Sequence, residues 1–268
     1  MEITRYVFNK WTKNQVKFLK KEYNLEVEEG YCTLWIKEND VFFQLEPVFE
    51  KWKVDKYHER YFSFSKKEIL NAEYCIIRGC HEGGYPMPDN LEYQELTYDM
   101  EVHCLKCGMI IVQKDAFRIQ KVPKHKIFGL TWVWDELFVQ LDVYQNIFEP
   151  LGIKCREVKL YRGDKIIPNI VQLVIPDTEE PLDLHEYSSQ ICPVCGRIKY
   201  EAKVNGFYPI HQHPLPHLYR SKEYFGDGGA ASRKIFISGE LRDILIKEKL
   251  MKYYWFDPCR DSVPKEPK

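Results

Sequence analysis

The sequence predicts an α+β fold that is rich in strands and forms one compact unit over residues 1–268. Of these residues, 44% are hydrophobic and 15% are aromatic, which is typical of folded proteins with half-buried sheet surfaces. Short apolar runs are separated by polar turns or by turns that contain Gly and Pro, a pattern typical of strands connected by turns. A pair of C-x-x-C-G motifs, at 104–108 and 192–196, is expected to join two distant segments.

The expected elements follow from hydrophobic spacing and turn signals. Apolar residues at helical spacing, and capping patterns such as Ser65 with Glu68, predict helices over 12–23, 65–72, 135–148 and 238–249, with one helical turn at 221–225. Apolar runs predict strands at 3–8, 31–36, 41–45, 73–79, 94–100, 109–113, 116–120, 128–134, 154–161, 170–175, 197–204, 234–237 and 253–256. The two strands within 31–45 are expected to form a hairpin, and the tail 257–268 is expected to be loose.

The two cysteine motifs carry the strongest chemical signal in the chain. Two residues between the cysteines let a tight turn point both sulfurs at one ion, and the following Gly allows the positive φ that such a turn needs. The halves are expected at 98–112 and 188–203. Four thiolates form a closed tetrahedral zinc set, so the sequence predicts a structural Zn²⁺ in a zinc-ribbon-like site, held by Cys104, Cys107, Cys192 and Cys195.

The cysteines also allow redox, core-packing and nucleophilic roles. A redox C-x-x-C would sit in a thioredoxin-like βαβ setting, whereas strands are expected on both sides of each turn here. Cys32, Cys75 and Cys155 lie in apolar runs and are expected to be buried as small hydrophobic residues. Cys80 and His81 resemble a nucleophile and a base, but neighbouring residues in an extended stretch usually point apart.

Two further motifs are assigned to the surface. His211, His213 and His217 are candidates for a second metal site, but the interleaved prolines favour an extended loop with exposed histidines. The glycine-rich stretch 226–229 lacks the G-K-[ST] ending of a phosphate-binding loop and is expected to be a surface loop. His103 lies directly before the first motif and is a candidate to replace one of the ligands. The four cysteines already complete the ligand set without it.

Charge and hydropathy narrow the function classes. The chain has 39 Lys and Arg against 40 Asp and Glu, so no overall field favours nucleic acid. No apolar stretch approaches the length that spans a bilayer, and no apolar signal core begins the chain, so a cytoplasmic protein is expected. Acidic clusters are expected to be solvated surface or a docking face for a basic protein. They lie within 22–29, 89–101 and 177–186.

The two C-x-x-C-G motifs and several stretches around them resemble the double-CxxCG motif family, a paralogous family of myxobacterial type. The stretches are 84–88, 96–99, 104–108, 117–118, 132–136, 152–158 and 192–196. The C-terminal part, 221–225 and 235–238 through 257–259, is similar to the strand–helix–strand end of several immunity families. The family includes immunity proteins that protect a cell from a contact-delivered polymorphic toxin. The resemblance implies a stoichiometric inhibitor of a cognate toxin, not an enzyme, and it carries over only the four cysteines, as zinc ligands.

The alternative is a zinc-ribbon protein that binds nucleic acid or acts as an adaptor. Basic residues lie near the motifs, at Lys106, Arg197, Lys199 and Lys203, and exposed aromatic side chains would stack on bases. An enzymatic reading would require an open metal position built from the three histidines. Residues 1–60 resemble no family.

Overall fold

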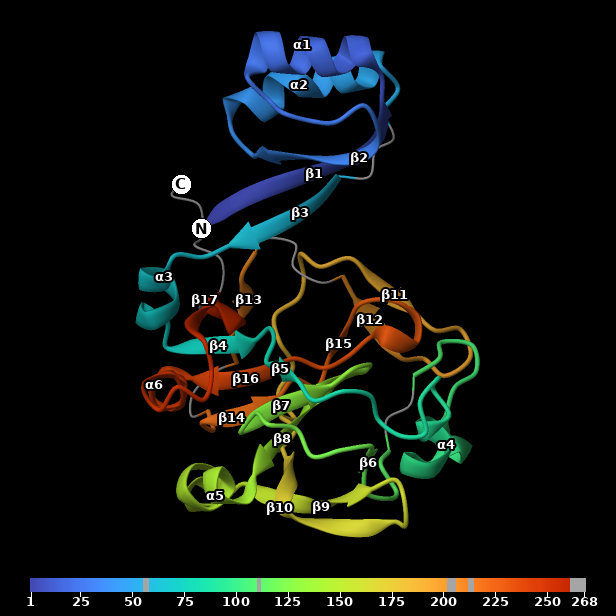
Figure 1. Cartoon of the computed structure of the whole chain (residues 1–268), viewed down its shortest axis with the longest axis vertical. Coiled ribbons are helices and arrows are strands. Elements are labelled where there is room, and N and C mark those ends of the chain that lie inside the picture. Colours follow the sequence, from blue (N-terminus) through green and yellow to red (C-terminus); the bar gives the residue numbers. More distant parts are fainter. Residues whose placement is uncertain (55–57, 110–111, 202–205, 212–214, 261–268) are drawn as a thin grey trace. The chain divides into compact units, whose positions relative to one another are not determined.

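The chain folds into two compact units, Met1–Ser65 and Lys66–Lys268, in the computed structural model (Figure 1). The structure describes residues 1–54, 58–109, 112–201, 206–211 and 215–260. The sequence predicts a single unit, and the structure has two because the apolar residues of the first 65 positions pack into a core of their own. Each unit is described by itself below.

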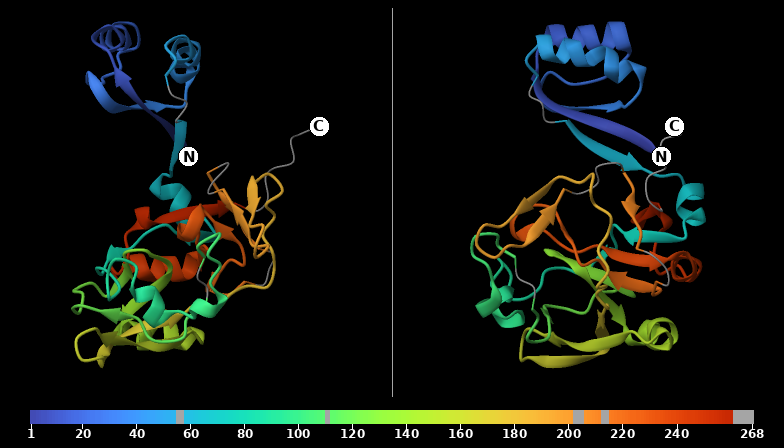
Figure 2. Two further views of the ribbon diagram at one scale, coloured as in Figure 1. Left: turned by 90° about the vertical axis from the view of Figure 1, so that its right-hand side faces the viewer. Right: turned by 180° about the vertical axis from the view of Figure 1, so that it is seen from behind.

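The first unit is an antiparallel sheet with two helices on one face (Figure 2). Its strands are ordered β2-β1-β3. They are β1 (Glu2–Trp11), β2 (Gly30–Lys37) and β3 (His58–Ser63), and the helices are α1 (Lys13–Tyr23) and α2 (Asp40–Lys51). Inward side chains of the sheet, such as Val7 and Leu34, pack against Leu19 of α1 and Phe42 of α2. The expected strand at 3–8 and helix at 12–23 are both present.

Helix α2 replaces the second strand of the hairpin expected at 31–45. The side chain of Asn39 accepts hydrogen bonds from the amides of Val41 and Phe42, at 3.1 and 3.4 Å, and so begins the helix. Phe42, Leu45 and Phe49 then lie on one face at helical spacing and are buried. A run of apolar residues without alternation is compatible with either element, and here the N-cap selects the helix.

Replacing Asn39 with alanine is expected to destabilise the first unit by about 1 kcal/mol, because two amides of α2 lose their acceptor. Asn39→Asp keeps an acceptor oxygen at the same position and should remain close to the wild type. Thermal unfolding followed by circular dichroism would measure both. An alanine variant as stable as the aspartate variant would show that the cap does not stabilise α2.

The second unit contains three sheets. A six-stranded sheet has the order β5-β7-β8-β10-β9-β6, a five-stranded sheet β13-β17-β4-β16-β14, and a three-stranded sheet β11-β12-β15. The strands are β4 (Tyr74–Ile77), β5 (His81–Glu82), β6 (Arg118–Ile119), β7 (Ile127–Leu130), β8 (Val133–Gln140), β9 (Lys154–Leu160), β10 (Lys165–Val174), β11 (Ser189–Ile191), β12 (Ile198–Tyr200), β13 (Tyr208–Pro209), β14 (Leu218–Arg220), β15 (Tyr224–Phe225), β16 (Ile235–Ser238) and β17 (Phe256–Arg260).

The helices of this unit are short. They are α3 (Lys66–Asn71), α4 (Tyr93–Thr97), α5 (Leu141–Val143) and α6 (Gly239–Lys247). A π-helical stretch at Tyr144–Phe148 continues α5, and single 3₁₀ turns occur at Met100–Val102, Glu149–Leu151, Gly228–Ala230 and Tyr253–Trp255. Ser238 caps α6 as expected, because its hydroxyl accepts the amide of Leu241 at 3.2 Å.

Arg242 of α6 is a fully buried cation that closes the end of α3. It is 1% exposed. Its guanidinium donates to the carbonyl oxygens of Ile69, Leu70 and Ala72, at 2.5 to 2.8 Å. The last carbonyls of a helix have no partner within the helix, so one planar side chain satisfies several of them at once. Gly239 gives this contact room, since a Cβ there would lie 2.9 Å from the Ala72 oxygen.

Ion pairs connect the six-stranded and five-stranded sheets. Arg220 of β14 donates to Glu136 of β8 at 2.5 Å and to Asp177 at 2.8 Å. Arg233 donates to Asp135 at 2.8 Å and also to Asp177. The two arginines and their partners Glu136 and Asp135 are less than a fifth exposed, so these two pairs are only weakly screened by solvent, whereas the Asp177 side chain is 46% exposed. The network holds residues 135 and 136 in one position relative to β14.

Several expected elements differ in the second unit. The strand expected at 94–100 is helix α4 followed by a 3₁₀ turn, and Asp135 lies inside β8, so the helix expected there begins only at Leu141. The turn expected at 221–225 ends in the strand β15. The tail expected to be loose from 257 is in strand β17 as far as Arg260, and 261–268 lie outside the described residues, as do 110–111 of the expected strand 109–113.

Asp115 beside β6 should make the second unit more stable at neutral than at acid pH. Its pKa is lowered to about 2: burial raises it, but hydrogen bonds from Arg118, the Ala116 amide and Lys159 lower it more. A carboxyl group with a depressed folded-state pKa stabilises the fold above its unfolded pKa, and this contribution is lost as the pH falls from about 3.8 towards 2.

Because the Asp115 side chain is 38% exposed, solvent screening limits the expected loss to about 1 kcal/mol. Urea unfolding of the wild type and of Asp115→Asn between pH 2 and 7 would measure it. The two proteins should converge at the acid end. A difference in stability that is the same at every pH would contradict this assignment.

Candidate metal centre

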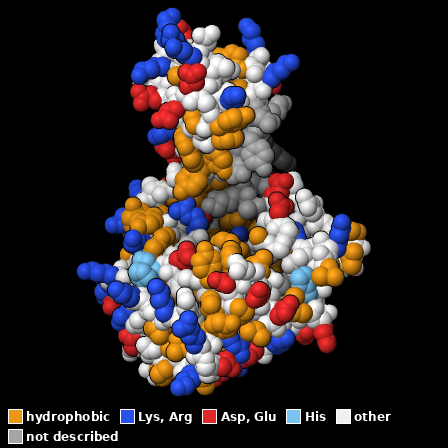
Figure 3. Space-filling model, turned by 45° about the vertical axis from the view of Figure 1, so that its right-hand side comes forward, with side chains coloured by type: hydrophobic (Ala, Val, Ile, Leu, Met, Phe, Trp, Pro, Cys, Tyr) orange, Lys and Arg blue, Asp and Glu red, His pale blue; other side chains and the backbone are white. Residues whose placement is uncertain are grey.

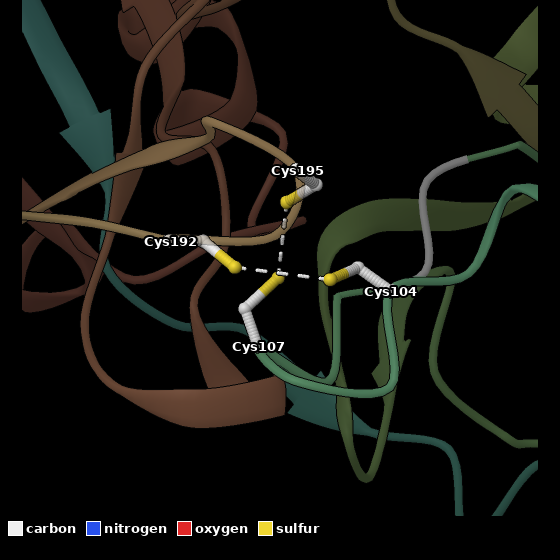
Figure 4. A group of neighbouring side chains, drawn as sticks. All are labelled: Cys104, Cys107, Cys192 and Cys195. Atoms are coloured by element: carbon white, nitrogen blue, oxygen red, sulfur yellow. Dashed lines mark hydrogen bonds between the residues drawn. The ribbon is translucent and has the colours of Figure 1, made fainter.

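The two C-x-x-C-G turns bring four sulfur atoms together, although 88 residues separate Cys104 from Cys192 (Figure 4). The Sγ atoms of Cys104 and Cys192 are 3.8 Å apart, and those of Cys107 and Cys195 are 3.6 Å apart. All four lie within 4.8 Å of one another. Disulfide sulfurs would be about 2.05 Å apart. Tetrahedral thiolates about 2.3 Å from a common metal would be about 3.8 Å apart, so this group fits a metal ion.

Both turns have the same backbone form. The amide of Gly108 donates to the carbonyl of Cys104 at 2.8 Å, and the amide of Gly196 donates to that of Cys192 at 2.9 Å. Both glycines have a φ of +70°, which side chains with a Cβ rarely adopt. At Gly108 space is limiting too, because a Cβ would lie 3.1 Å from the backbone of Gly229.

The electrostatics of the group favour a cation. The pKa of Cys192 is lowered to about 6, because the amides of Cys195 and Val194 donate to its sulfur. The pKa of Cys195 is raised to about 11: the Arg197 amide lowers it, but burial and the three neighbouring thiols raise it more. Four sulfurs this close do not all ionise unless a positive charge compensates them, and a bound metal ion supplies that charge.

A buried lysine holds the first turn against the second half of the chain. Lys199 of β12 donates to the carbonyl oxygens of Cys107 and Gly228, both at 2.7 Å. Its residue exposure is 8%. Met109, Tyr224 and Ala231 pack around the sulfurs. Cys195 is the exposed member of the group, whereas the other three cysteines are buried.

The two halves differ in their flanking structure. Strands β11 and β12 enter and leave the second turn as an antiparallel pair, with Ile191 opposite Ile198. Before the first turn the chain forms α4 and a 3₁₀ turn, and an isolated bridge joins Tyr98 to Gln113. The described residues therefore show an antiparallel pair of strands at the second half, and a helix and a 3₁₀ turn before the first.

The remaining candidates lie apart from this centre. His211 is 3% exposed, so its expected exposure was wrong, and it contacts the Tyr219 hydroxyl at 3.2 Å. His217 contacts Ser238, and His213 lies outside the described residues, as does Lys203.

Burial raises the pKa of Cys80 to about 11, which does not suit a nucleophile. Cys75 is buried as expected, whereas Cys32 and Cys155 are half-buried.

A cavity of about 720 Å³ beside the first cysteine turn was not predicted. Aromatic side chains of Tyr93, Tyr98, Trp132 and Trp134 line it, together with Asp135 and the segment 229–232. Gly108 and His103 also line it, so the metal centre and the cavity share a wall. The two tryptophans in the run 132–134 are the sequence signal for it, but their partners lie about 40 residues earlier in the chain.

Comparison of the chain with family models, curated proteins and solved structures gave no significant match. Among the described residues, no helix is long and apolar enough to cross a membrane.

Proposed function

We propose that this chain is a cytoplasmic immunity protein, which binds a cognate polymorphic toxin stoichiometrically and neutralises it without catalysis. The observation that carries the proposal is the meeting of the two C-x-x-C-G motifs in one closed four-sulfur group. The double motif is the signature of the double-CxxCG family that the chain resembles. A closed group of this kind suits a scaffold whose function lies on the surfaces it supports.

We further propose that the bound metal is Zn²⁺ and that its role is structural. Four cysteine thiolates at these spacings match the preferred tetrahedral set of zinc, and no coordination position is left for a substrate or a reactive water. Elemental analysis of the purified protein should give one zinc per chain. A second metal, or iron in place of zinc, would contradict this assignment.

An aromatic sheet face on the first unit supports binding to a protein partner. Its members are Tyr6, Phe8, Tyr31, Trp35 and Tyr61, which lie on the side of the sheet that faces away from the core. Tyr6 and Trp35 are cross-strand partners, with rings 5.0 Å apart. Trp35 is 57% exposed and Tyr31 71%. Figure 3 also shows hydrophobic side chains at the surface. Exposed Tyr, Trp and Phe are enriched in protein interfaces.

Expression of the chain together with the product of the neighbouring toxin gene tests the proposal. Cells should survive the toxin, and the two proteins should copurify. A double variant, Tyr31→Ser with Trp35→Ser, should lose both effects while the unit stays folded, because both side chains are exposed. Tyr161→Ser, at a tyrosine that is 40% exposed in the second unit, is the matched control. If cells that express the wild-type chain did not survive the toxin, and if the two proteins did not copurify, the proposal would be refuted.

The same aromatic sheet face favours single-stranded nucleic acid as a second candidate partner. Bases stack on exposed aromatic rings of sheets, and lysines beside the rings attract phosphates. Lys10 lies 5.5 Å above the Tyr31 ring. Lys37, at the other end of β2, already pairs with Glu2 at 2.7 Å, which weakens this case. Salt-dependent binding of an oligonucleotide that Trp35→Ser abolishes would favour this candidate, and no binding at low salt would exclude it.

A further inference from the structure

The cavity beside the first cysteine turn has the composition of a site for a flat organic cation. Tyr93, Tyr98, Trp132 and Trp134 give it aromatic walls, and Asp135 is the one formally charged residue among the described residues that line it. Neither lysine nor arginine is among those lining residues. Aromatic faces attract cations, and a guanidinium group also stacks flat on them. The volume, about 720 Å³, is that of a typical ligand site.

Hydrogen-bond acceptors in the wall complete the match. Arg233 donates to Oδ2 of Asp135, whereas no hydrogen bond among the described residues uses Oδ1. The Nδ1 atom of His103 is buried and has no partner within the described part of the chain. The amide side chains of Asn90 and Gln94 line the same space. A group with several N–H donors in one plane would bond to Oδ1 of Asp135 and to the side-chain oxygens of Asn90 and Gln94, as guanidinium does.

The local charge balance also favours a cation. The network behind the cavity sets three acidic side chains, Asp135, Glu136 and Asp177, against two guanidinium groups, Arg220 and Arg233, and burial raises the pKa of Glu136. The pKa of Tyr98 is raised well above its usual value, first by burial and then by the charges of Glu136 and Asp135. A hydroxyl group in a negative environment resists ionisation, and a cation placed there is stabilised.

The backbone of Trp132 supports the same assignment. It has a φ of +68°, a conformation that costs energy for a bulky residue. The strained turn between β7 and β8 brings the Trp132 carbonyl to the Tyr93 hydroxyl, which donates to it at 3.5 Å. The strained turn at Trp132 therefore goes together with a fixed position of Trp132 and Tyr93 in the wall of the cavity.

We infer that this cavity binds a guanidinium group, carried either by a small molecule or by an arginine side chain of a protein partner. The inference does not depend on the proposed toxin-binding function, since it concerns a different surface.

Calorimetric titration of the metal-loaded full chain tests this inference with matched pairs of probes. Butylguanidine is compared with the neutral butylurea, and the peptide Gly-Gly-Arg-Gly-Gly with its citrulline counterpart. In any pair whose members enter the cavity, the charged probe should bind at least about tenfold more tightly than the neutral probe. Tighter binding of the arginine peptide than of butylguanidine identifies a protein side chain as the ligand, and the reverse order identifies a small molecule.

Variants locate the binding in the cavity. Trp134→Leu should weaken the charged probe about tenfold, because one aromatic wall is lost. Trp134 is 61% exposed, so the fold should tolerate this change. Tyr161→Leu, at a tyrosine that is 40% exposed in the same unit and is not among the residues that line the cavity, is the matched control. Equal binding of charged and neutral probes, no binding up to about 10 mM, or an unaffected Trp134→Leu variant would each overturn the inference.

Discussion

Replacing Cys104 with serine is expected to release the bound metal and to destabilise the second unit by roughly 3–6 kcal/mol, because the free energy of metal binding is part of the free energy of folding here. Serine is a poor ligand for a thiophilic ion, and three thiolates leave the tetrahedral set incomplete. Cys195→Ser should behave in the same way, although Cys195 is the exposed member of the group. Metal content by elemental analysis and urea unfolding would measure the two effects.

Cys32→Ser is the matched control for this experiment. Cys32 lies in the first unit, outside the sulfur group, and its thiol contacts the carbonyl of Glu28 at 3.3 Å, a contact that a serine hydroxyl can also make. It should keep its metal and its stability. If Cys104→Ser kept both as well, the four cysteines would not form a metal centre.

Replacing Arg242 with methionine is expected to destabilise the second unit by about 3–5 kcal/mol. The change preserves most of the side-chain length but removes the guanidinium donors from the carbonyls of Ile69, Leu70 and Ala72, of which, among the described residues, Ile69 alone keeps a second backbone donor, the Ala72 amide at 3.3 Å. Each unsatisfied buried group costs about 1–3 kcal/mol. Arg242→Lys should recover only part of the loss, because an ammonium group does not have the planar fork that reaches three acceptors.

The surface variant Arg162→Met removes the same charge from an exposed position and serves as control. Its free energy of unfolding, measured with urea, should remain within about 0.5 kcal/mol of the wild type. If Arg242→Met were as stable as this control, the hydrogen bonds to the end of α3 would contribute nothing net. An arginine-to-lysine variant with full stability would show that charge alone, and not the fork, matters.

Sequence reasoning identified the four cysteines because their chemistry depends on local spacing. Each C-x-x-C-G turn is complete within five residues, and its glycine needs the same positive φ in both copies. The flanking structure was predicted less well. The run 41–45 does not alternate apolar and polar residues, so only the Asn39 N-cap indicates a helix. Of the strand expected at 94–100, residues 94–97 belong to helix α4, in which Tyr93 and Thr97 are buried.

The cavity and the ion-pair network could not have been predicted in this way. Arg220 meets Glu136 across 84 residues, and Arg233 meets Asp135 across 98. No local pattern relates such pairs, because the packing of the two sheets brings them together. The same holds for Arg242, which a sequence pattern places on the exposed face of a helix as readily as at the end of α3.

The spacing of the two cysteine turns also imposes an order of events during synthesis. A ribosome adds roughly 5–20 residues per second, so the second turn follows the first by roughly 4–18 s. During that interval Cys104 and Cys107 provide only two of the four sulfur atoms, and the four-cysteine group cannot form. The nascent second unit thus completes this group late, after the first unit has been entirely synthesised.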